Sequence, residues 1–326
     1  MTICATKREN MQRIQVGVSA CLLGEKVRYD GGHKANPYLI STLGHLFSWV
    51  PLCPEKEAGL GVPREPIRIV KNEAGNLKLI GATSRKDVTE KLTNWIENKL
   101  PKLANFSGFI LKGKSPSCGV RQKATVYDEE GRFSGKSMGL FAQKISEAFP
   151  FIPITDESIF KWSLKLQGFL EEVGTYERFC LLKKRGITPA SLRDFHKRHR
   201  LLIKSHSPRI LLAIDSLIAE LEKEWKSGLE DVYYSHLKSA FHYDATPPKH
   251  LRCLLDLKES LKEKLSISEK IEVESKIEEF NKGSLPLSFV LPIFARLVKK
   301  YNLPSYRRDV YLFSPLFPME GKEERR

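Results

Sequence analysis

The stretch IQVGVSAC, from Ile14 to Cys21, is an apolar run typical of a β-strand, with a cysteine just beyond its carboxyl end. The same arrangement occurs twice more, in LFSWVPLC (46–53) and in SGFILKGKSPSC (107–118). Helical patterns cover residues 85–100 and 137–149. Strands that alternate with helices predict crossover connections, and therefore a mostly parallel, Rossmann-like sheet in an α/β domain.

The three cysteines of these stretches, Cys21, Cys53 and Cys118, are expected to lie close together. Ligands of parallel sheets bind beyond the carboxyl ends of the strands, which is where all three fall. Thiolates select zinc, copper(I) or iron–sulfur clusters. A structural zinc site usually takes four closely paired ligands, and the sequence has no CxxC pair. A four-iron cluster on three thiolates leaves one iron open to a substrate atom, and three unrelated thiols are the alternative.

The second half of the chain has a different pattern. A length of 326 residues suggests two domains. From about residue 156 onward the pattern is helical without strands, so we predict an α/β domain over residues 1–155 and an all-α domain over residues 156–326. The predicted helices are 158–173, 189–204, 208–225, 231–241, 251–264, 266–281 and 287–301.

Composition and hydropathy indicate a soluble protein of the cytoplasm. The chain is 41% hydrophobic and 29% charged, as is typical of packed globular domains. No apolar run approaches the roughly 18 residues of a membrane span, and residues 1–10 are too polar for a signal peptide. We therefore expect cytoplasmic localisation, no membrane partner, and cysteines that act as thiols or metal ligands rather than in disulfides.

The net charge of +15 favours a polyanionic partner. Residues 183–209 contain nine Lys and Arg against one acid, Asp194. Helical spacing places four of these cations on one face, and we predict that they bind RNA phosphates: Arg193, Lys197, Arg200 and Lys204. The alternative is an ordinary solvated helix face.

Three segments of the first half resemble the signature blocks of the thiouracil desulfidase family. They are VSACLLGEKVRYDGGHK (18–34), CPEKEAGLGVPREPIR (53–68) and GFILKGKSPSCG (108–119), and the resemblance extends over roughly residues 11–155. The segment DFHKRHRLLIKSHSP (194–208) is similar to a helical domain that is fused to this module in one subgroup. That subgroup resembles bacterial enzymes that remove sulfur from 4-thiouridine in transfer RNA.

The resemblance implies a [4Fe-4S] cluster on Cys21, Cys53 and Cys118, with the thiocarbonyl sulfur of the substrate at the open iron. It also implies catalytic roles for Glu55 and Ser115. The implied function is a tRNA 4-thiouridine desulfidase that yields uridine and sulfide without net redox change. A desulfidase of free thiouracil or related small thioamides and a non-catalytic RNA-binding cluster protein are the alternatives.

Several predicted site residues also have plain structural interpretations. Glu55 is placed for acid–base chemistry beside the cysteines, or it is a helix-start carboxylate paired with Lys56 or Arg64. Ser117 competes with Ser115 for the serine role. Turn chemistry alone accounts for an Asp before two glycines. The residues predicted to bind substrate are Asp30, His33, Lys34, Arg64 and Ser117.

Overall fold

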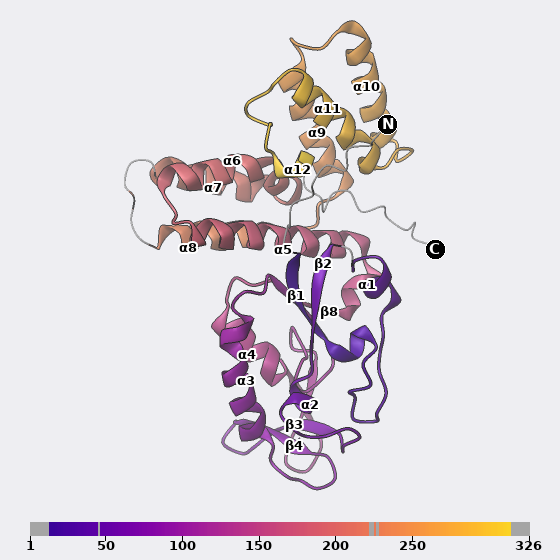
Figure 1. Ribbon diagram of the computed structural model, residues 1–326, viewed down its shortest axis with the longest axis vertical. Coiled ribbons are helices and arrows are strands. Elements are labelled where there is room, and N and C mark those ends of the chain that lie inside the picture. The colour runs from indigo at the N-terminus through magenta and orange to yellow at the C-terminus, as the bar shows by residue number, and fades with distance from the viewer. Residues whose placement is uncertain (1–12, 45, 222–224, 226–227, 314–326) are drawn as a thin grey trace, which may run out of the picture. The chain divides into compact units, whose positions relative to one another are not determined.

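The computed structural model describes residues 13–44, 46–221, 225 and 228–313 (Figure 1). It divides into two compact units between Phe160 and Lys161. The predicted domain boundary lies between residues 155 and 156. Of the residues between the two boundaries, Asp156 ends a β-strand and residues 157–160 belong to a short 3-10 helix, η2 (Glu157–Lys161).

The first unit is built on a four-stranded sheet in which every pair of neighbours is parallel. Its strands are β1 (Ile14–Ser19), β2 (Phe47–Leu52), β5 (Gly108–Leu111) and β8 (Ile154–Asp156), in the order β2-β1-β5-β8. The central strand β5 is buried along its whole length, as expected for a parallel sheet covered on both faces. The predicted parallel α/β architecture is confirmed.

Helices flank this sheet. They are α1 (Pro37–Ser41), α2 (Pro54–Glu57), α3 (Thr89–Leu103) and α4 (Leu140–Ala148), with the 3-10 helix η1 (Ala20–Leu23) directly after β1. In Figure 1, α3 and α4 lie together on one side of the sheet, and α1 lies on the other. Trp95 of α3 and Phe141 of α4 join the two helices through a tilted ring contact at 5.6 Å.

A second, mixed sheet was not predicted. It contains β3 (Ile67–Lys71), β4 (Leu77–Gly81), β6 (Ala124–Tyr127) and β7 (Phe133–Ser137), in the order β4-β3-β6-β7. Only the β3–β6 pair is parallel. These strands bury one face against α3, and that cluster includes Ile69, Leu79, Leu92 and Val126.

The second unit is helical throughout its described residues, as predicted. Its helices are α5 (Ser163–Lys184), α6 (Pro189–His206), α7 (Pro208–Leu221), α8 (Leu229–Ala240), α9 (Pro247–Leu261), α10 (Ile267–Asn281), α11 (Leu287–Lys300) and α12 (Val310–Phe313). Helix α6 begins where the sequence indicates, because Thr188 accepts a hydrogen bond from the amide of Ser191 and Pro189 occupies the first turn. Across the described part of the chain, no helix combines the length and apolarity that a membrane crossing needs.

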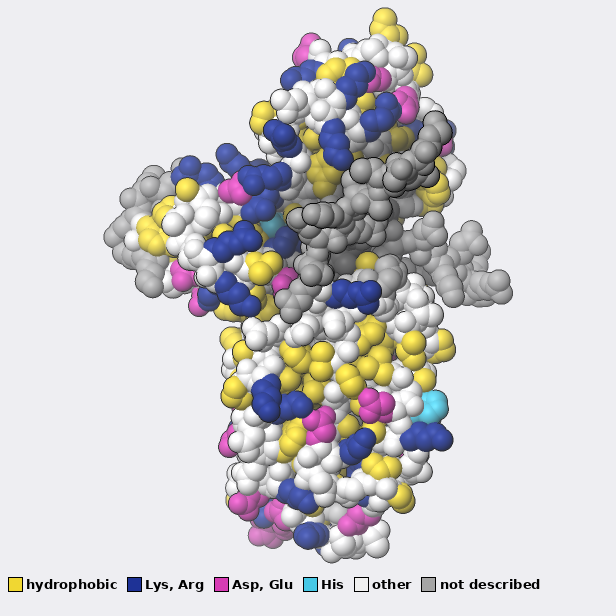
Figure 2. Space-filling view, in the orientation of Figure 1, with side chains coloured by type: hydrophobic (Ala, Val, Ile, Leu, Met, Phe, Trp, Pro, Cys, Tyr) yellow, Lys and Arg dark blue, Asp and Glu magenta, His cyan; other side chains and the backbone are white. Residues whose placement is uncertain are grey.

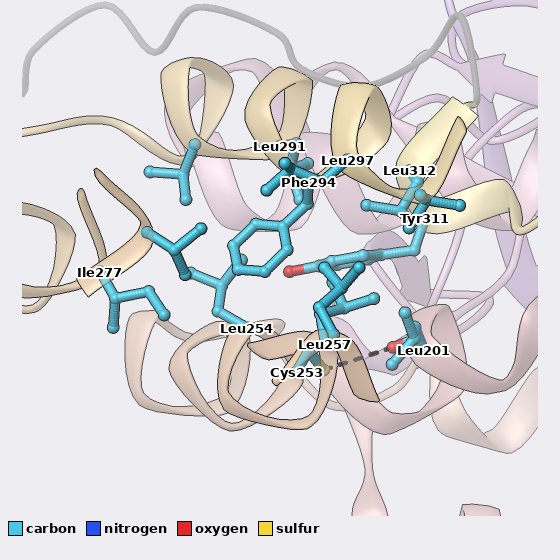
Figure 3. Packing of buried hydrophobic residues seen from close by; sticks show 14 of the residues in the cluster. Leu201, Cys253, Leu254, Leu257, Ile277, Leu291, Phe294, Leu297, Tyr311 and Leu312 are labelled. Carbon is cyan, nitrogen blue, oxygen red and sulfur yellow. Dashed lines mark hydrogen bonds between the residues drawn. The ribbon is translucent and has the colours of Figure 1, made fainter. Parts of the chain in front are cut away.

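A leucine-rich core holds the later helices of this unit together. Figure 3 shows Phe294 of α11 near Leu254 and Leu257 of α9, with Tyr311 of α12 beside them. The thiol of Cys253 donates to the carbonyl of Leu201 at 3.5 Å, which ties α9 to α6. This packing fixes the segment between α11 and α12 against α6.

Candidate functional site

The three predicted cysteines line one cavity of about 360 Å³ in the first unit. Cys21 lies in η1 directly after β1, and Cys53 is the residue before the first turn of α2, directly after β2. Cys118 lies in the loop that follows β5. The parallel sheet therefore brings together three residues far apart in sequence, at the carboxyl ends of neighbouring strands.

Burial dominates the electrostatics of these thiols. Burial, and after it the neighbouring Cys53, raises the pKa of Cys21 to about 11. Burial likewise raises the pKa values of the Cys53 and Cys118 thiols. Thiols in such a setting become thiolates when a bound cationic group stabilises them.

The donor set fits a polynuclear group better than a single ion. Among the described residues, no three His, Cys, Asp or Glu side chains converge closely enough to hold one metal ion. Cys21, Cys53 and Cys118 nevertheless share one cavity and influence one another's charge. A group in which each sulfur binds a different metal ion matches this arrangement.

Ser19, which was not predicted from the sequence, supports Cys118. It is buried at the last position of β1, and its hydroxyl accepts the amide hydrogen of Lys112 at 2.9 Å. The same hydroxyl is hydrogen-bonded to the Cys118 thiol. Because the oxygen already accepts from Lys112, its own hydrogen is available to the sulfur. Its position between an apolar strand and the first cysteine was the only sequence signal.

The loop that carries Cys118 is fixed against the start of α4. The amide of Gly139 donates to the carbonyl of Gly119 at 2.7 Å, and the amide of Phe141 donates to that of Ser117 at 2.8 Å. A Cβ atom at Gly139 would lie only 2.5 Å from the carbonyl carbon of Ser117. Glycine is therefore required for this close approach.

Glu55, in the first turn of α2, is held from two sides. Its Oε2 accepts from Nε and Nη2 of Arg64 at 3.1 and 2.5 Å, and its Oε1 accepts from the Ser117 hydroxyl at 2.8 Å. Its side chain is 14% exposed and that of Arg64 is 7% exposed. The ion pair with Arg64, an alternative at the sequence level, is thus present, and it orients Glu55 toward the loop of Cys118.

Arg64 uses its donors within the protein. Besides the pair with Glu55, its Nη1 donates to the carbonyls of Val27 at 3.1 Å and Gly61 at 2.9 Å. It lines the cavity, as a substrate-binding residue would. In this structure, however, its contacts make it the support of Glu55, and its predicted contact with substrate remains a prediction.

The structure separates the two candidate serines. Ser115 lines the cavity, and its oxygen accepts the amide hydrogens of Ser117 and Cys118, both at 3.1 Å. Its hydroxyl lies 3.4 Å from Oε1 of Glu55. Ser117 is fully buried and lies outside the cavity lining, and its hydroxyl donates to Oε1 of Glu55. Of the two, Ser115 faces the space available to a substrate.

Lys34, Asp30 and His33 differ in their relation to the cavity. Lys34 lines it, and its amide donates to the carbonyl of Cys21 at 2.8 Å. Asp30 lies outside the lining, accepts the amide hydrogen of Gly32 at 3.0 Å and pairs with Arg28. His33 is exposed outside the lining. The turn interpretation therefore explains Asp30, because its side chain closes the turn before the glycines.

Further cations line the cavity that were not predicted. They are Arg28, Lys112 and Lys114. The guanidinium of Arg28 lies 5.3 Å from the ring centre of Tyr29, and Lys112 is paired with Glu157. With Lys34 and Arg64, the lining carries five cations, of which Arg28, Lys112 and Arg64 are paired with acids and Lys34 and Lys114 form no ion pair among the described residues. The cavity is therefore suited to a substrate that carries negative charge.

In the second unit, three of the four predicted RNA-binding residues share a cavity. Lys197, Arg200 and Lys204 line it, whereas Arg193 lies outside its lining. Figure 2 shows more Lys and Arg than Asp and Glu side chains over the helices of this unit, on the face in view. Within the described residues, the histidines of α6 are buried and take part in internal hydrogen bonds, as with His196 to Asp215 and His199 to the Phe195 carbonyl.

Comparisons with known proteins match the two halves separately. The family model described as 2-thiouracil desulfurase matches residues 16–157, and a model of a protein family of unknown function, DUF1722, matches residues 200–315. The uncharacterized protein YbbK of Bacillus subtilis is 36% identical over 128 residues, which is 37% of this chain and 80% of that protein. A solved structure of the [4Fe-4S]-dependent thiouracil desulfidase TudS matches with 29% identity and a TM-score of 0.37, covering 46% of this chain and 94% of that one.

Proposed function

Because the chain belongs to the 2-thiouracil desulfurase family through residues 16–157, we propose that it removes sulfur from 4-thiouridine in transfer RNA, giving uridine and sulfide. The observation that carries the proposal is one cavity lined by three cysteines together with Glu55 and Ser115. The reaction replaces a thiocarbonyl sulfur with the oxygen of water. Both water protons leave with the sulfur as hydrogen sulfide, so no electrons are gained or lost.

In this proposal Cys21, Cys53 and Cys118 hold a [4Fe-4S] cluster, leaving one iron without a protein ligand. When bound, the cluster supplies a Lewis acid with affinity for sulfur. The chain contributes the thiols, and the Ser19 hydroxyl steadies one of them.

Glu55 acts as the acid–base group. Its Oε1 points toward the loop of Cys118, while Arg64 holds the other oxygen. In that position the carboxylate accepts a proton from the water that attacks the thio-bearing carbon, and it then returns the proton to the departing group. Ser115 lies beside Oε1 on the cavity wall, where its hydroxyl can donate to the polar edge of the base.

The RNA substrate is supported by charge in both units. The whole chain carries +15, and the first cavity is lined by two lysines, Lys34 and Lys114, that form no ion pair among the described residues and that a neutral free base would not require. A base within RNA must leave its stack to enter such a cavity, at a cost of a few kcal/mol that contacts with flanking phosphates offset. The proposal includes a cytoplasmic location, because transfer RNA and reduced thiols are found there.

The test is turnover of thiolated transfer RNA by anaerobically reconstituted protein. We expect sulfide release and uridine formation, abolished by Cys118→Ala and reduced about 10²- to 10⁴-fold by Glu55→Gln, the range typical of losing a general acid–base group. Glu147→Gln, on exposed α4 surface, is the matched control and should keep full activity. Loss of activity in the control, or full activity in Glu55→Gln, would contradict the assignment.

Desulfuration of a free base is the second candidate, and the name of the matching family model favours it. The same assay with free 2-thiouracil distinguishes the two. RNA turnover should fall steeply as salt rises, because phosphate contacts release counterions, whereas turnover of a neutral base should not. A protein that binds RNA tightly but releases no sulfide from either compound would instead be a binding protein.

A further inference from the structure

A second cavity lies in the helical unit, and its lining includes cations outside the predicted helix face of Arg193, Lys197, Arg200 and Lys204. It measures about 560 Å³ and lies between α6, α9 and the segment that joins α11 to α12. Five cations line it: Lys197, Arg198, Arg200, Lys204 and Arg308. Arg308 comes from the joining segment, far from α6 in the sequence, so only the fold brings it to this group.

One carboxylate holds two of these cations together. Asp194 Oδ2 lies 3.1 Å from Nε of Arg198, and its Oδ1 accepts from Nη2 of Arg308 at 2.8 Å. A guanidinium carries five N–H donors, so most donors of Arg198 and Arg308 are not used by Asp194 and can bind a ligand. The result is a pair of arginines in fixed positions with a net charge of +1, an arrangement suited to the oxygens of a phosphate.

The other cations extend this charge along α6. Arg200 pairs with Asp215 at 2.8 Å, and Lys204 pairs with Asp256. Lys197 is exposed, and it forms no ion pair with any residue in the described parts of the chain. The lining as a whole has five cations against three acids, Asp194, Asp256 and Asp309. The excess positive charge is therefore concentrated at Lys197 and at the pair on Asp194.

We propose that this cavity binds the phosphodiester backbone of RNA, with Arg198 and Arg308 on one phosphate and Lys197 and Arg200 on its neighbours. The side chains of Arg308 and Arg200 are 68% and 49% exposed. Positive charge is therefore accessible at the protein surface as well as inside the cavity, as binding to several successive phosphates requires. A single free phosphate would meet only part of it. The choice of RNA rests on the proposed function, whereas the anion site itself rests on the geometry.

The test measures binding of unthiolated transfer RNA to the full chain by fluorescence anisotropy, so that no chemistry takes place. Arg308→Gln should weaken binding about tenfold, and it should reduce the slope of log K against log salt by about one, as expected for one lost phosphate contact. Arg296→Gln is the matched control, because Arg296 is also an exposed arginine paired with an acid, Glu272. The control should leave both quantities unchanged.

Asp194→Asn separates a built site from general positive charge. The substitution makes the cavity more positive, so unspecific attraction would tighten RNA binding. Loss of the group that positions Arg198 and Arg308 should instead weaken binding, about threefold or more. Tighter binding by Asp194→Asn, or unchanged binding by Arg308→Gln, would overturn the proposal.

Small anions and catalysis provide the remaining controls. Uridine monophosphate or inorganic phosphate that displaced the RNA below millimolar concentration would show that a free anion is the occupant, and would overturn RNA as the ligand. Sulfide release from free 2-thiouracil by Arg308→Gln should equal that of the wild type, because the substitution lies in the other unit. Failure of the wild type in that assay and on thiolated RNA would contradict the proposed function, while the RNA-binding result would still stand.

Discussion

Glu55 shows how much of the site depends on single contacts. Its carboxylate is held by Arg64 on one oxygen and by Ser117 on the other, and Ser115 stands beside it on the cavity wall. Neither support is a sequence neighbour of Glu55, since Arg64 is nine residues away and Ser117 belongs to a different loop. The geometry of the proposed acid–base group, Glu55, is therefore a property of the folded unit.

Arg64→Lys tests that support at the residue scale. A lysine retains the charge but lacks the two coplanar N–H groups with which Arg64 donates to Oε2 of Glu55. We expect a loss of roughly tenfold in kcat with unchanged iron content, because the carboxylate is mispositioned rather than removed. Single-turnover sulfide release, with iron quantified in the same sample, measures both. Unchanged kcat would show that Glu55 does not depend on Arg64.

Ser19→Ala tests the support of Cys118. The substitution leaves the buried amide of Lys112 without its acceptor and removes the hydrogen bond to the thiol, so we expect a loss of about 1–3 kcal/mol in the free energy of unfolding. Urea unfolding of the metal-free protein measures it. Ser41→Ala, where the hydroxyl is exposed on α1, should change stability by less than about 0.5 kcal/mol. Equal effects of the two substitutions would argue against the role of Ser19.

The buried carboxyl group of Asp309 should make the stability of the protein depend on pH. Burial raises its pKa to about 7, well above the 3.8 of an unperturbed Asp, while its Oδ1 accepts the amides of Tyr311 and Leu312. The folded state therefore keeps a proton that the unfolded state loses, and this group destabilises the protein as pH rises from about 4 to 7. Asp309→Asn keeps the acceptor without the charge.

Unfolding curves at several pH values test this directly. The variant should gain on the order of 2–4 kcal/mol over the wild type at pH 8 and little near pH 4. A gain that did not depend on pH would contradict the titration of Asp309.

At the scale of elements, apolar runs predicted the strands that carry the cysteines, because buried parallel strands are continuous in hydrophobicity. Helix boundaries were less accurate. The helix predicted over 85–100 begins at Thr89, since Arg85 has a φ of 60° and Asp87 bridges to Ile80 of β4. The helix predicted over 137–149 begins at Leu140, because residues 133–137 pair with β6 instead. Pairing between distant segments is not visible in local periodicity.

The same reasoning explains the missing second sheet. Strands β3 and β4 are only five residues long; β3 has buried apolar residues interrupted by exposed Arg68 and Lys71, and β4 begins with exposed Leu77 and Lys78. Patterns this short fit a strand or a loop equally well. Their identity is fixed by the packing of one face against α3, which involves residues far along the chain.

Gly139→Ala tests the junction between the Cys118 loop and α4. The added methyl group would meet the backbone of Ser117 at 2.5 Å, so the loop must move, and we expect a loss of about 1–3 kcal/mol in stability together with lower iron binding. Gly168→Ala, inside α5, meets only the edge of His206 at 3.4 Å and serves as the control. Iron content after reconstitution and thermal unfolding report the two effects. Normal iron binding in Gly139→Ala would show that the loop tolerates displacement.

At the scale of the whole molecule, residue type and order predict that the three cysteines share one site. The fold determines which charged side chains line each cavity. The positions of the three cysteines after apolar strands, and the resemblance of their blocks, are enough to predict that they meet at one site. The cations Arg28, Lys112 and Lys114 and the anchor Ser19 depend on strand register and loop conformation, which the sequence does not display. Likewise, Arg308 joins α6 only through the packing of α11 and α12.

The most direct test of the central claim is the stoichiometry of desulfuration on transfer RNA that contains 4-thiouridine, under anaerobic conditions and without any reductant. We predict one sulfide released and one uridine formed for each 4-thiouridine consumed over repeated turnovers, with none from Cys118→Ala. Consumption that needed a reductant, or persistence of 4-thiouridine in the presence of fully reconstituted wild-type protein, would contradict it.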